Sequence, residues 1–202
     1  MKPTPDYSFE TDLNANGALR IAGVDEVGRG PLAGPVTAAA VILDPARIPE
    51  GLNDSKALTA KRRALLEPLI FASAEVSIAH ATVEEIDDMN ILRASHLAME
   101  RAVAGLGHVD HALIDGNMIP RDLTCPATTI IKGDARSVSI AAASIVAKIC
   151  RDRIMVELAQ QFPGYGWETN AGYGSKSHIS ALQNIGVTPY HRRSFKPVYN
   201  ML

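Results

Sequence analysis

The chain has 202 residues, of which 47% are hydrophobic and 21% are charged, and its formal net charge is −2 at pH 7. This length and composition indicate one folded α/β domain, and they exclude both a disordered chain and two domains of ordinary size. The two cysteines show no CxxC or Cys/His spacing, which argues against a disulfide framework and against a zinc site.

The first 19 residues are polar and contain two prolines. We expect them to form a flexible N-terminal extension, so that the folded domain spans residues 20–202. They carry three acids and no apolar core segment, so they do not resemble a secretory signal, and we expect a cytoplasmic protein. The longest apolar run, Val36–Leu43, is far too short to span a membrane.

The remaining chain alternates strand and helix patterns. Ile21–Val27 and Val36–Leu43 read as strands joined by a Gly- and Pro-rich turn, which predicts a hairpin. Thr59 can cap a helix that runs to Leu66, and Pro68 should kink or end it. An antiparallel opening followed by alternating helices and strands predicts a mixed sheet with helices on its faces. The later predicted elements are strands at Glu75–Ala81, His111–Ile114 and Ala127–Ile131, and helices at Val83–Asp88, Ile91–Ala104, Ser137–Gln161 and Ser177–Asn184.

Four acidic residues lie where the predicted elements end or break. Asp25 and Glu26 are late in the first strand, Asp115 ends a short buried strand, and Asp134 precedes the long helix. Asp115 could instead belong to a turn, and Asp134 could help to cap a helix. The pair in the first strand is harder to explain in that way, because charges inside an apolar strand are costly unless something pairs with them.

If the strands that carry these acids are neighbours in one sheet, the carboxylates converge. Several carboxylates within a few ångströms cannot all stay ionised without a cation between them. Oxygen ligands without His or Cys suit Mg²⁺ or Mn²⁺, and such a site can hold two ions ~3.5–4 Å apart for phosphodiester hydrolysis. Strict alternation puts Asp25 and Glu26 on opposite faces, so both reach one site only if the strand distorts or a main-chain oxygen takes part.

The turn after the acidic pair, Gly28–Gly34, has glycines on both sides of Arg29. Glycines there would let a ligand approach bare backbone, although an ordinary hairpin turn explains them equally well. Neither this turn nor Gly174–Ser177 has the spacing of a dinucleotide-binding or phosphate-binding loop, which disfavours a nucleotide-binding enzyme.

Charge is unevenly distributed along the chain. A net charge of −2 by itself argues against a nucleic-acid partner. After Glu168, however, no acid occurs, which suggests one basic face; a solvated polar tail is the alternative. The basic residues of this stretch are Lys176, His178, His191, Arg192, Arg193 and Lys196.

The residues around the acids closely resemble the signature of the ribonuclease HII family, the bacterial type 2 ribonucleases H. The first matching motif is Gly23–Gly34, which contains the acidic pair and the glycine-rich turn. The others follow in family order over nearly all of the chain after residue 19, and the ordered set is highly specific. They are Asn53–Lys56, Ile114–Gly116, Lys132–Asp134, Ala141–Lys148, Gly172–Ser175 and His191–Phe195.

The resemblance implies a ribonuclease H-like fold, a mixed five-stranded sheet flanked by helices with a C-terminal helical extension. It implies an endonuclease that hydrolyses the RNA strand of RNA–DNA hybrids, including single ribonucleotides in duplex DNA, and leaves 5′-phosphate and 3′-hydroxyl ends. The implied cofactor is Mg²⁺ or Mn²⁺, with two ions during catalysis. The implied partner is an RNA–DNA hybrid or a ribonucleotide-containing duplex, and we expect a monomer without a membrane partner.

By position in the motifs, Asp25, Glu26, Asp115 and Asp134 would be the catalytic, metal-binding carboxylates. A resolvase or transposase of the same superfold is disfavoured by the glycine-rich turn and the Tyr173 loop. A hybrid-binding protein without catalysis is disfavoured by the four acids, because a surface that only binds gains nothing from repelling phosphates.

The resemblance also implies a substrate-binding set. Its turn residues are similar to the family's reader of the ribose 2′-hydroxyl and adjacent phosphate, and bare backbone can bond that hydroxyl. Tyr173 is similar to the family's contact at the RNA-to-DNA junction, and Lys56 to a phosphate contact. Without the resemblance, a loop tyrosine and a surface lysine would be the simpler interpretations. The complete set is Gly28, Arg29, Gly30, Lys56 and Tyr173.

Overall fold

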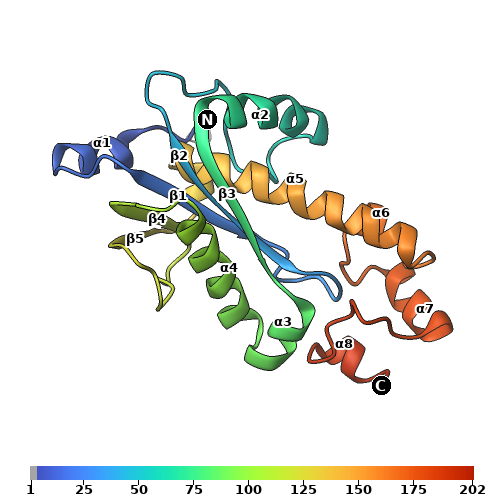
Figure 1. Cartoon of the computed structure of the whole chain (residues 1–202). Coiled ribbons are helices and arrows are strands. Elements are labelled where there is room, and N and C mark those ends of the chain that lie inside the picture. Colours follow the sequence, from blue (N-terminus) through green and yellow to red (C-terminus); the bar gives the residue numbers. More distant parts are fainter. Residues whose placement is uncertain (1–3) are drawn as a thin grey trace.

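The computed structural model describes residues 4–202, which form a mixed five-stranded sheet covered by helices (Figure 1). The strand order is β3-β2-β1-β4-β5. The first three strands pair antiparallel, whereas β4 pairs parallel to β1 and β5 parallel to β4. The sheet is therefore the predicted one, opened by the predicted hairpin. The strands are β1 (Ile21–Val27), β2 (Val36–Leu43), β3 (Ala74–Ala81), β4 (His111–Asp115) and β5 (Ala127–Ile130).

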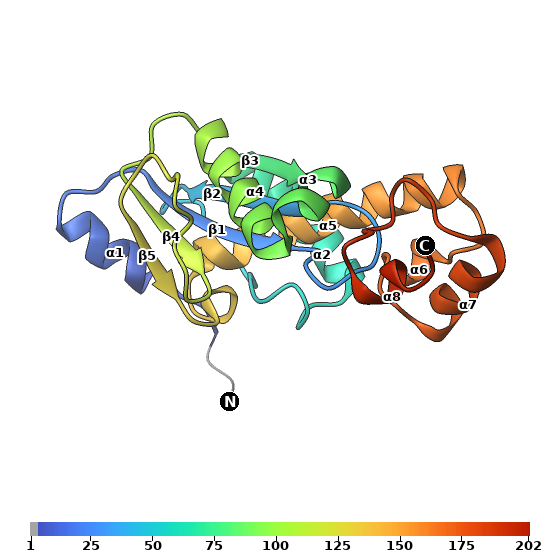
Figure 2. The same ribbon diagram turned by 90° about the horizontal axis from the view of Figure 1, so that it is seen from below.

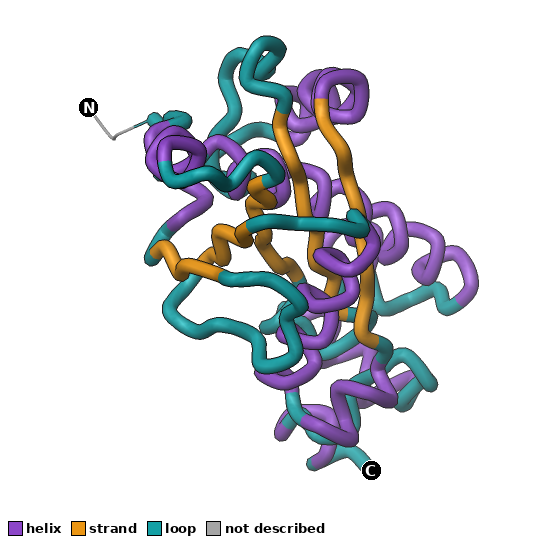
Figure 3. The backbone as a smooth tube through the Cα atoms, turned by 60° about the vertical axis from the view of Figure 1, so that its left-hand side comes forward, coloured by secondary structure: helices purple, strands orange, loops and turns teal. Residues whose placement is uncertain are grey.

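The helices surround the strands, as the purple and orange segments of Figure 3 show. Several begin at a Ser or Thr whose hydroxyl accepts the amide three residues on; Thr59 does so as the sequence predicts, and Ser137 does so for α5. The helices are α1 (Ser8–Ala15), α2 (Ala60–Ser73), α3 (Val83–Met89), α4 (Ile91–Gly105), α5 (Val138–Gln161), α6 (Trp167–Asn170), α7 (Lys176–Ile185) and α8 (Lys196–Tyr199), with a short 3-10 helix η1 (Gly133–Ala135).

Alternation along β1 and β2 divides the core between two faces. On one face Ala22 and Val24 pack with α3 and α4, and on the other Ala39 and Val41 pack with α2 and α5. Gly23 faces α5, where a Cβ would collide with the backbone of Ser139, so the absence of a side chain lets α5 lie close to β1. Figure 2 shows these two layers from below.

The C-terminal helices form a separate cluster at the far end of α5 (Figure 2). Its core is the buried Trp167, packed with Met155, Leu182 and Val198 and with Leu32 from the turn after β1. This cluster is the C-terminal helical extension that the resemblance implies. No helix of the described residues is long and apolar enough to cross a membrane.

The structure departs from the predicted elements in three places. Helix α1 lies within the segment expected to be flexible, and its Phe9 packs against the core near Ile21. The division of the chain at residue 19 stays a prediction, although part of the expected extension is docked onto the domain. Helix α2 continues through Pro68 because burial of Leu66 and Ile70 outweighs one lost hydrogen bond. The short helices α6 and α8 were not predicted.

Candidate active site

The parallel pairing of β1 with β4 brings two of the four predicted acids side by side. Val24 is in register with Ile114, so Asp25 and Asp115 are the next residues on adjacent strands. Leu113 packs on Ile140 of α5, and alternation puts Asp115 on that same face. Asp134 joins them from η1, so that one oxygen of each of these three carboxylates lies within 4.8 Å of the others.

The turn that carries Asp134 is shaped around Asp115. The Gly133 amide donates to Oδ1 of Asp115 at 2.7 Å, and Lys132 has a left-handed backbone with φ 55°. A Cβ on Gly133 would lie 3.2 Å from that oxygen and 2.6 Å from the Ile140 side chain. Only glycine therefore fits between β4 and α5 while its amide holds the carboxylate.

Burial and repulsion from neighbouring charges raise the pKa of two carboxyls in this cluster. Burial, followed by the charges of Glu26 and Asp115, holds the pKa of Asp25 well above its usual range. Burial, followed by the charges of Asp115 and Asp54, raises the pKa of Asp134 to about 6. The three acids therefore repel one another at neutral pH, and a divalent cation with a preference for oxygen ligands, Mg²⁺ or Mn²⁺, fits this donor set.

Glu26 is not a member of the three-carboxylate cluster. Alternation directs its side chain toward α4, where Oε1 accepts a hydrogen bond from Arg29 at 3.2 Å. Glu26 and Asp115 both line a cavity of about 150 Å³ that also contains His96. Burial raises the pKa of Glu26 although Arg29 opposes the shift. The acidic site therefore extends to both faces of the sheet edge, with Asp115 shared between them.

The loop before α2 brings a lysine to the acids. Burial lowers the pKa of Lys56, but the charges of Asp25, Asp54 and the other acids of the site outweigh that effect and raise it. Asp54 was not singled out from the sequence, although it lies in the same matching motif as Lys56. The loop is fixed to α5 because the Ser144 hydroxyl donates to the Ser55 hydroxyl at 2.8 Å.

The glycine-rich turn, residues 28–35, lies against the loop that carries Tyr173. A Cβ on Gly30 would be 3.3 Å from Cε1 of Tyr173, and the Leu32 amide donates to the Gly172 carbonyl at 2.8 Å. Gly28 has φ +95° and no room for a Cβ beside Arg151. The half-exposed Tyr173 ring therefore covers Gly30. The turn links this ring to the acidic site, because Arg29 of the turn donates to the Glu26 carboxylate.

The prediction of a basic C-terminal face is wrong for half of its residues. Arg192, His178 and His191 are buried, whereas Lys176, Arg193 and Lys196 are exposed. The two histidines lie inside the C-terminal cluster, where their Nε2 atoms are 3.0 Å apart and the Trp167 indole donates to His178. These groups build the interior of the extension and do not form a surface for phosphates.

Known proteins resemble this chain over nearly its whole length. A family model described as Ribonuclease HII matches residues 22–198. A ribonuclease HII of Ruegeria pomeroyi is 71% identical over 199 residues, which cover 98% of this chain and 85% of that protein. A ribonuclease HII of Roseobacter denitrificans is 69% identical over 93% of this chain and 96% of that protein. The crystal structure of ribonuclease H2 from Pyrococcus horikoshii OT3 superposes with a TM-score of 0.75 at 26% identity, covering 91% of this chain and 97% of that one.

Proposed function

This chain belongs to the ribonuclease HII family, and we propose which of its residues carry out the reaction of that family. It is a metal-dependent endonuclease that hydrolyses the RNA strand of RNA–DNA hybrids, and cleavage at single ribonucleotides in duplex DNA is typical of the family. The observation that supports the residue assignment most directly is the convergence of Asp25, Asp115 and Asp134 at the edge of the sheet.

In this proposal Asp25, Asp115 and Asp134 hold the divalent metal, Mg²⁺ or Mn²⁺, and Glu26 completes the site from the face of α4. The proposed site would hold two ions during catalysis, as the resemblance implies. When bound, the metal supplies a Lewis acid that favours charge on the phosphate oxygens. Hydrolysis joins a water oxygen to phosphorus and breaks the bond to the 3′ oxygen, which takes a proton, so the ends are a 5′-phosphate and a 3′-hydroxyl.

The substrate strand would run from the acids across the glycine-rich turn to Tyr173. Backbone groups of Gly28, Arg29 and Gly30 would bond the ribose 2′-hydroxyl, the group that distinguishes RNA from DNA at one position. The exposed face of the Tyr173 ring would pack on the sugar that follows. Lys56, kept charged by the neighbouring acids, would contact a phosphate.

Two further proposals concern the protein as a whole. The first is that the protein acts as a monomer, the state expected from the resemblance. Both cysteines, Cys125 and Cys150, are free thiols, which fits the expected cytoplasmic location because that compartment is reducing.

The assignment of the acids is tested with Asp115→Asn. An amide oxygen can still accept the Gly133 amide, so the fold should be kept while a negative ligand is lost. We expect cleavage of a labelled hybrid in Mg²⁺ to fall at least 100-fold, in the range of other catalytic-group removals, with hybrid binding unchanged or tighter. Asp122→Asn, on an exposed carboxylate, is the control and should cleave normally. Undiminished cleavage by Asp115→Asn would remove Asp115 from the site.

A further inference from the structure

Two arginines from distant parts of the chain are buried against the glycine-rich turn. Arg151 comes from α5 and Arg192 from the segment before α8, and both are at most 1% exposed. Among residues 4–202 neither forms an ion pair with a carboxylate. A buried guanidinium without a carboxylate is costly unless other groups satisfy it, so its hydrogen-bond partners identify what it holds.

Arg192 uses its whole donor set on the turn. Its Nη2 donates to the Gly28 carbonyl at 2.6 Å, its Nη1 to the Arg29 and Pro31 carbonyls at 3.0 and 2.8 Å, and its Nε and Nη2 both to the Gly34 carbonyl at 3.0 and 2.9 Å. A guanidinium has five N–H groups, and these five bonds account for all of them.

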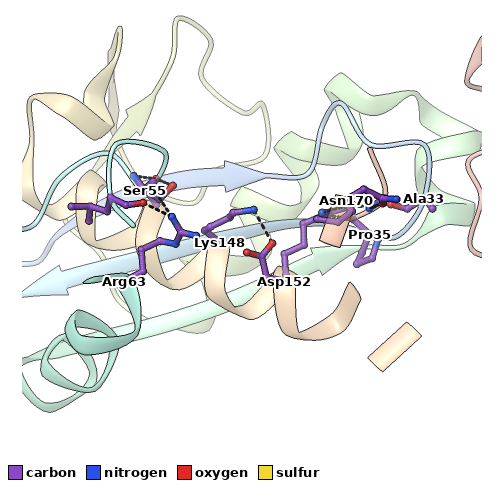
Figure 4. A network of polar contacts seen from close by, with 12 residues as sticks. Ala33, Pro35, Ser55, Arg63, Lys148, Asp152 and Asn170 are labelled. Atoms are coloured by element: carbon purple, nitrogen blue, oxygen red, sulfur yellow. Dashed lines mark hydrogen bonds and ion pairs between the residues drawn. The ribbon is translucent and has the colours of Figure 1, made fainter. Parts of the chain in front are cut away.

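Arg151 holds the other side of the turn. It donates from Nη2 to the Ala33 carbonyl at 3.0 Å and from Nε to the Pro35 carbonyl at 2.9 Å. Figure 4 shows Ala33 and Pro35 together beside the end of this network. Its Nη1 donates to the Ala171 carbonyl at 2.9 Å, which links the turn to the loop of Tyr173. The Arg192 amide adds a bond to the Leu32 carbonyl at 2.8 Å.

These bonds fix the direction of two peptide planes. In a planar trans peptide the carbonyl of one residue and the amide of the next point in opposite directions. Because Arg192 draws the carbonyls of Gly28 and Arg29 inward, the amides of Arg29 and Gly30 must point away from it. Neither amide donates to another group within the described residues. The following residue, Pro31, has no amide hydrogen, so this pair of outward-facing amides ends at Gly30.

We propose that Arg151 and Arg192 are positioning residues that hold the glycine-rich turn with the Arg29 and Gly30 amides directed at the ribonucleotide. The inference rests on the proposed function, in which this turn reads the 2′-hydroxyl. Neither arginine touches the substrate; each acts through the carbonyls that it binds. The two amides stand preorganised beside Tyr173, so binding a ribose needs no rearrangement of the backbone.

The variant that tests this is Arg192→Lys. A lysine keeps the charge but is a compact ammonium group, which cannot span the four carbonyls that the planar guanidinium bridges. The preference of the protein for a duplex with one ribonucleotide over the matched all-DNA duplex is measured by fluorescence anisotropy in Ca²⁺. Loss of two neutral hydrogen bonds should reduce that preference by about 5- to 30-fold. The Mg²⁺ concentration that gives half-maximal cleavage should stay unchanged, because Arg192 donates to backbone carbonyls and to none of the site's carboxylates.

The matched control is Arg153→Lys, on an exposed α5 arginine that pairs with Glu67. It should keep the wild-type preference. A wild-type preference in Arg192→Lys would overturn the inference while leaving the proposed function intact. If the wild-type protein itself shows no preference, the proposed reading of the 2′-hydroxyl fails, and the inference fails with it.

Amide hydrogen exchange on the wild-type protein gives an answer even if Arg192→Lys does not fold. The Arg29 and Gly30 amides should exchange rapidly in the free protein and become protected when the single-ribonucleotide duplex is bound in Ca²⁺. The all-DNA duplex should protect them less. Amides that are already protected in the free protein would overturn the inference, because they would then be engaged inside the fold.

Discussion

Replacing Asp134 with asparagine should stabilise the metal-free protein while it removes cleavage. Burial, followed by the charges of Asp115 and Asp54, raises the pKa of Asp134 from 3.8 to about 6. One pH unit corresponds to ~1.4 kcal/mol, and solvent screens this half-buried group, so at pH 7.5 the ionised carboxylate costs the folded state about 1–2 kcal/mol without metal. A residue that served only to cap or brace the fold would show the opposite sign.

The pH dependence follows from the direction of the shift. The folded pKa of Asp134 lies above the unfolded value, so its contribution to stability is fully present below pH 3.8 and is lost as the pH rises through about 6. Asparagine does not titrate. The free energy of unfolding of Asp134→Asn should therefore exceed that of the wild type by about 1–2 kcal/mol at pH 7.5 and by much less near pH 4.

The assay is urea unfolding in EDTA, followed by the fluorescence of the single tryptophan, Trp167, which is fully buried. Adding Mg²⁺ should stabilise the wild type more than Asp134→Asn, because a ligand that binds only the folded state raises its stability. Asp122→Asn, on an exposed carboxylate, should match the wild type throughout. A less stable Asp134→Asn protein at pH 7.5 in EDTA would refute this reasoning.

Three further changes should have measurable effects. Burial, with repulsion from the neighbouring histidine, lowers the pKa of His191 from 6.5 to about 4. The neutral His191 therefore contributes roughly 3 kcal/mol to the free energy of unfolding above pH 6.5, and this contribution is lost as the pH falls toward 4. Urea unfolding of the wild type and of His191→Gln at several pH values should reveal the loss, and equal pH dependence in the two proteins would contradict it. Gly30→Val should push the Tyr173 ring aside and lower kcat/KM on a single-ribonucleotide duplex at least 10-fold, a loss of about 1.4 kcal/mol or more. The Mg²⁺ concentration for half-maximal cleavage should stay unchanged, and a normal kcat/KM would show that the turn does not contact the substrate. Glu10→Ala removes the carboxylate that accepts the Ser137 hydroxyl and the Ser139 amide at the start of α5, and it should lower the free energy of unfolding by about 2 kcal/mol. Asp12→Ala, at an exposed position, should not, and equal urea midpoints for Glu10→Ala and the wild type would show that α1 does not stabilise the domain.

Local patterns predicted the parts of the fold that depend on local physics. The bounds of β1 and β2 follow from apolar runs closed by glycine and proline, and the cap at Thr59 follows from its hydroxyl. Alternation also predicted that Asp25 and Glu26 lie on opposite faces of β1. The structure agrees: Glu26 turns toward α4, and the three-carboxylate cluster forms without it.

Contacts between distant segments could not be predicted in this way. Charge and polarity suggested a surface role for Arg192 and a loose tail for the first 19 residues. The partners of Arg192 are neutral backbone carbonyls more than 150 residues earlier, at Gly28 and Gly34, which no sequence pattern reveals. Glu10 is similarly buried against Ser137, far along the chain. Burial of a charge depends on such partners, so it needs the tertiary structure.

The dependence of cleavage on a single 2′-hydroxyl tests the central claim most directly. Three duplexes of one sequence would carry, at a single position, a ribonucleotide, its 2′-deoxy counterpart or its 2′-O-methyl counterpart. With purified protein in Mg²⁺ or Mn²⁺, we predict nicking of the ribonucleotide duplex alone, on the 5′ side of the ribonucleotide, and none after Asp115→Asn. Comparable nicking of the all-DNA duplex, or none of the ribonucleotide duplex with either metal, would contradict the account.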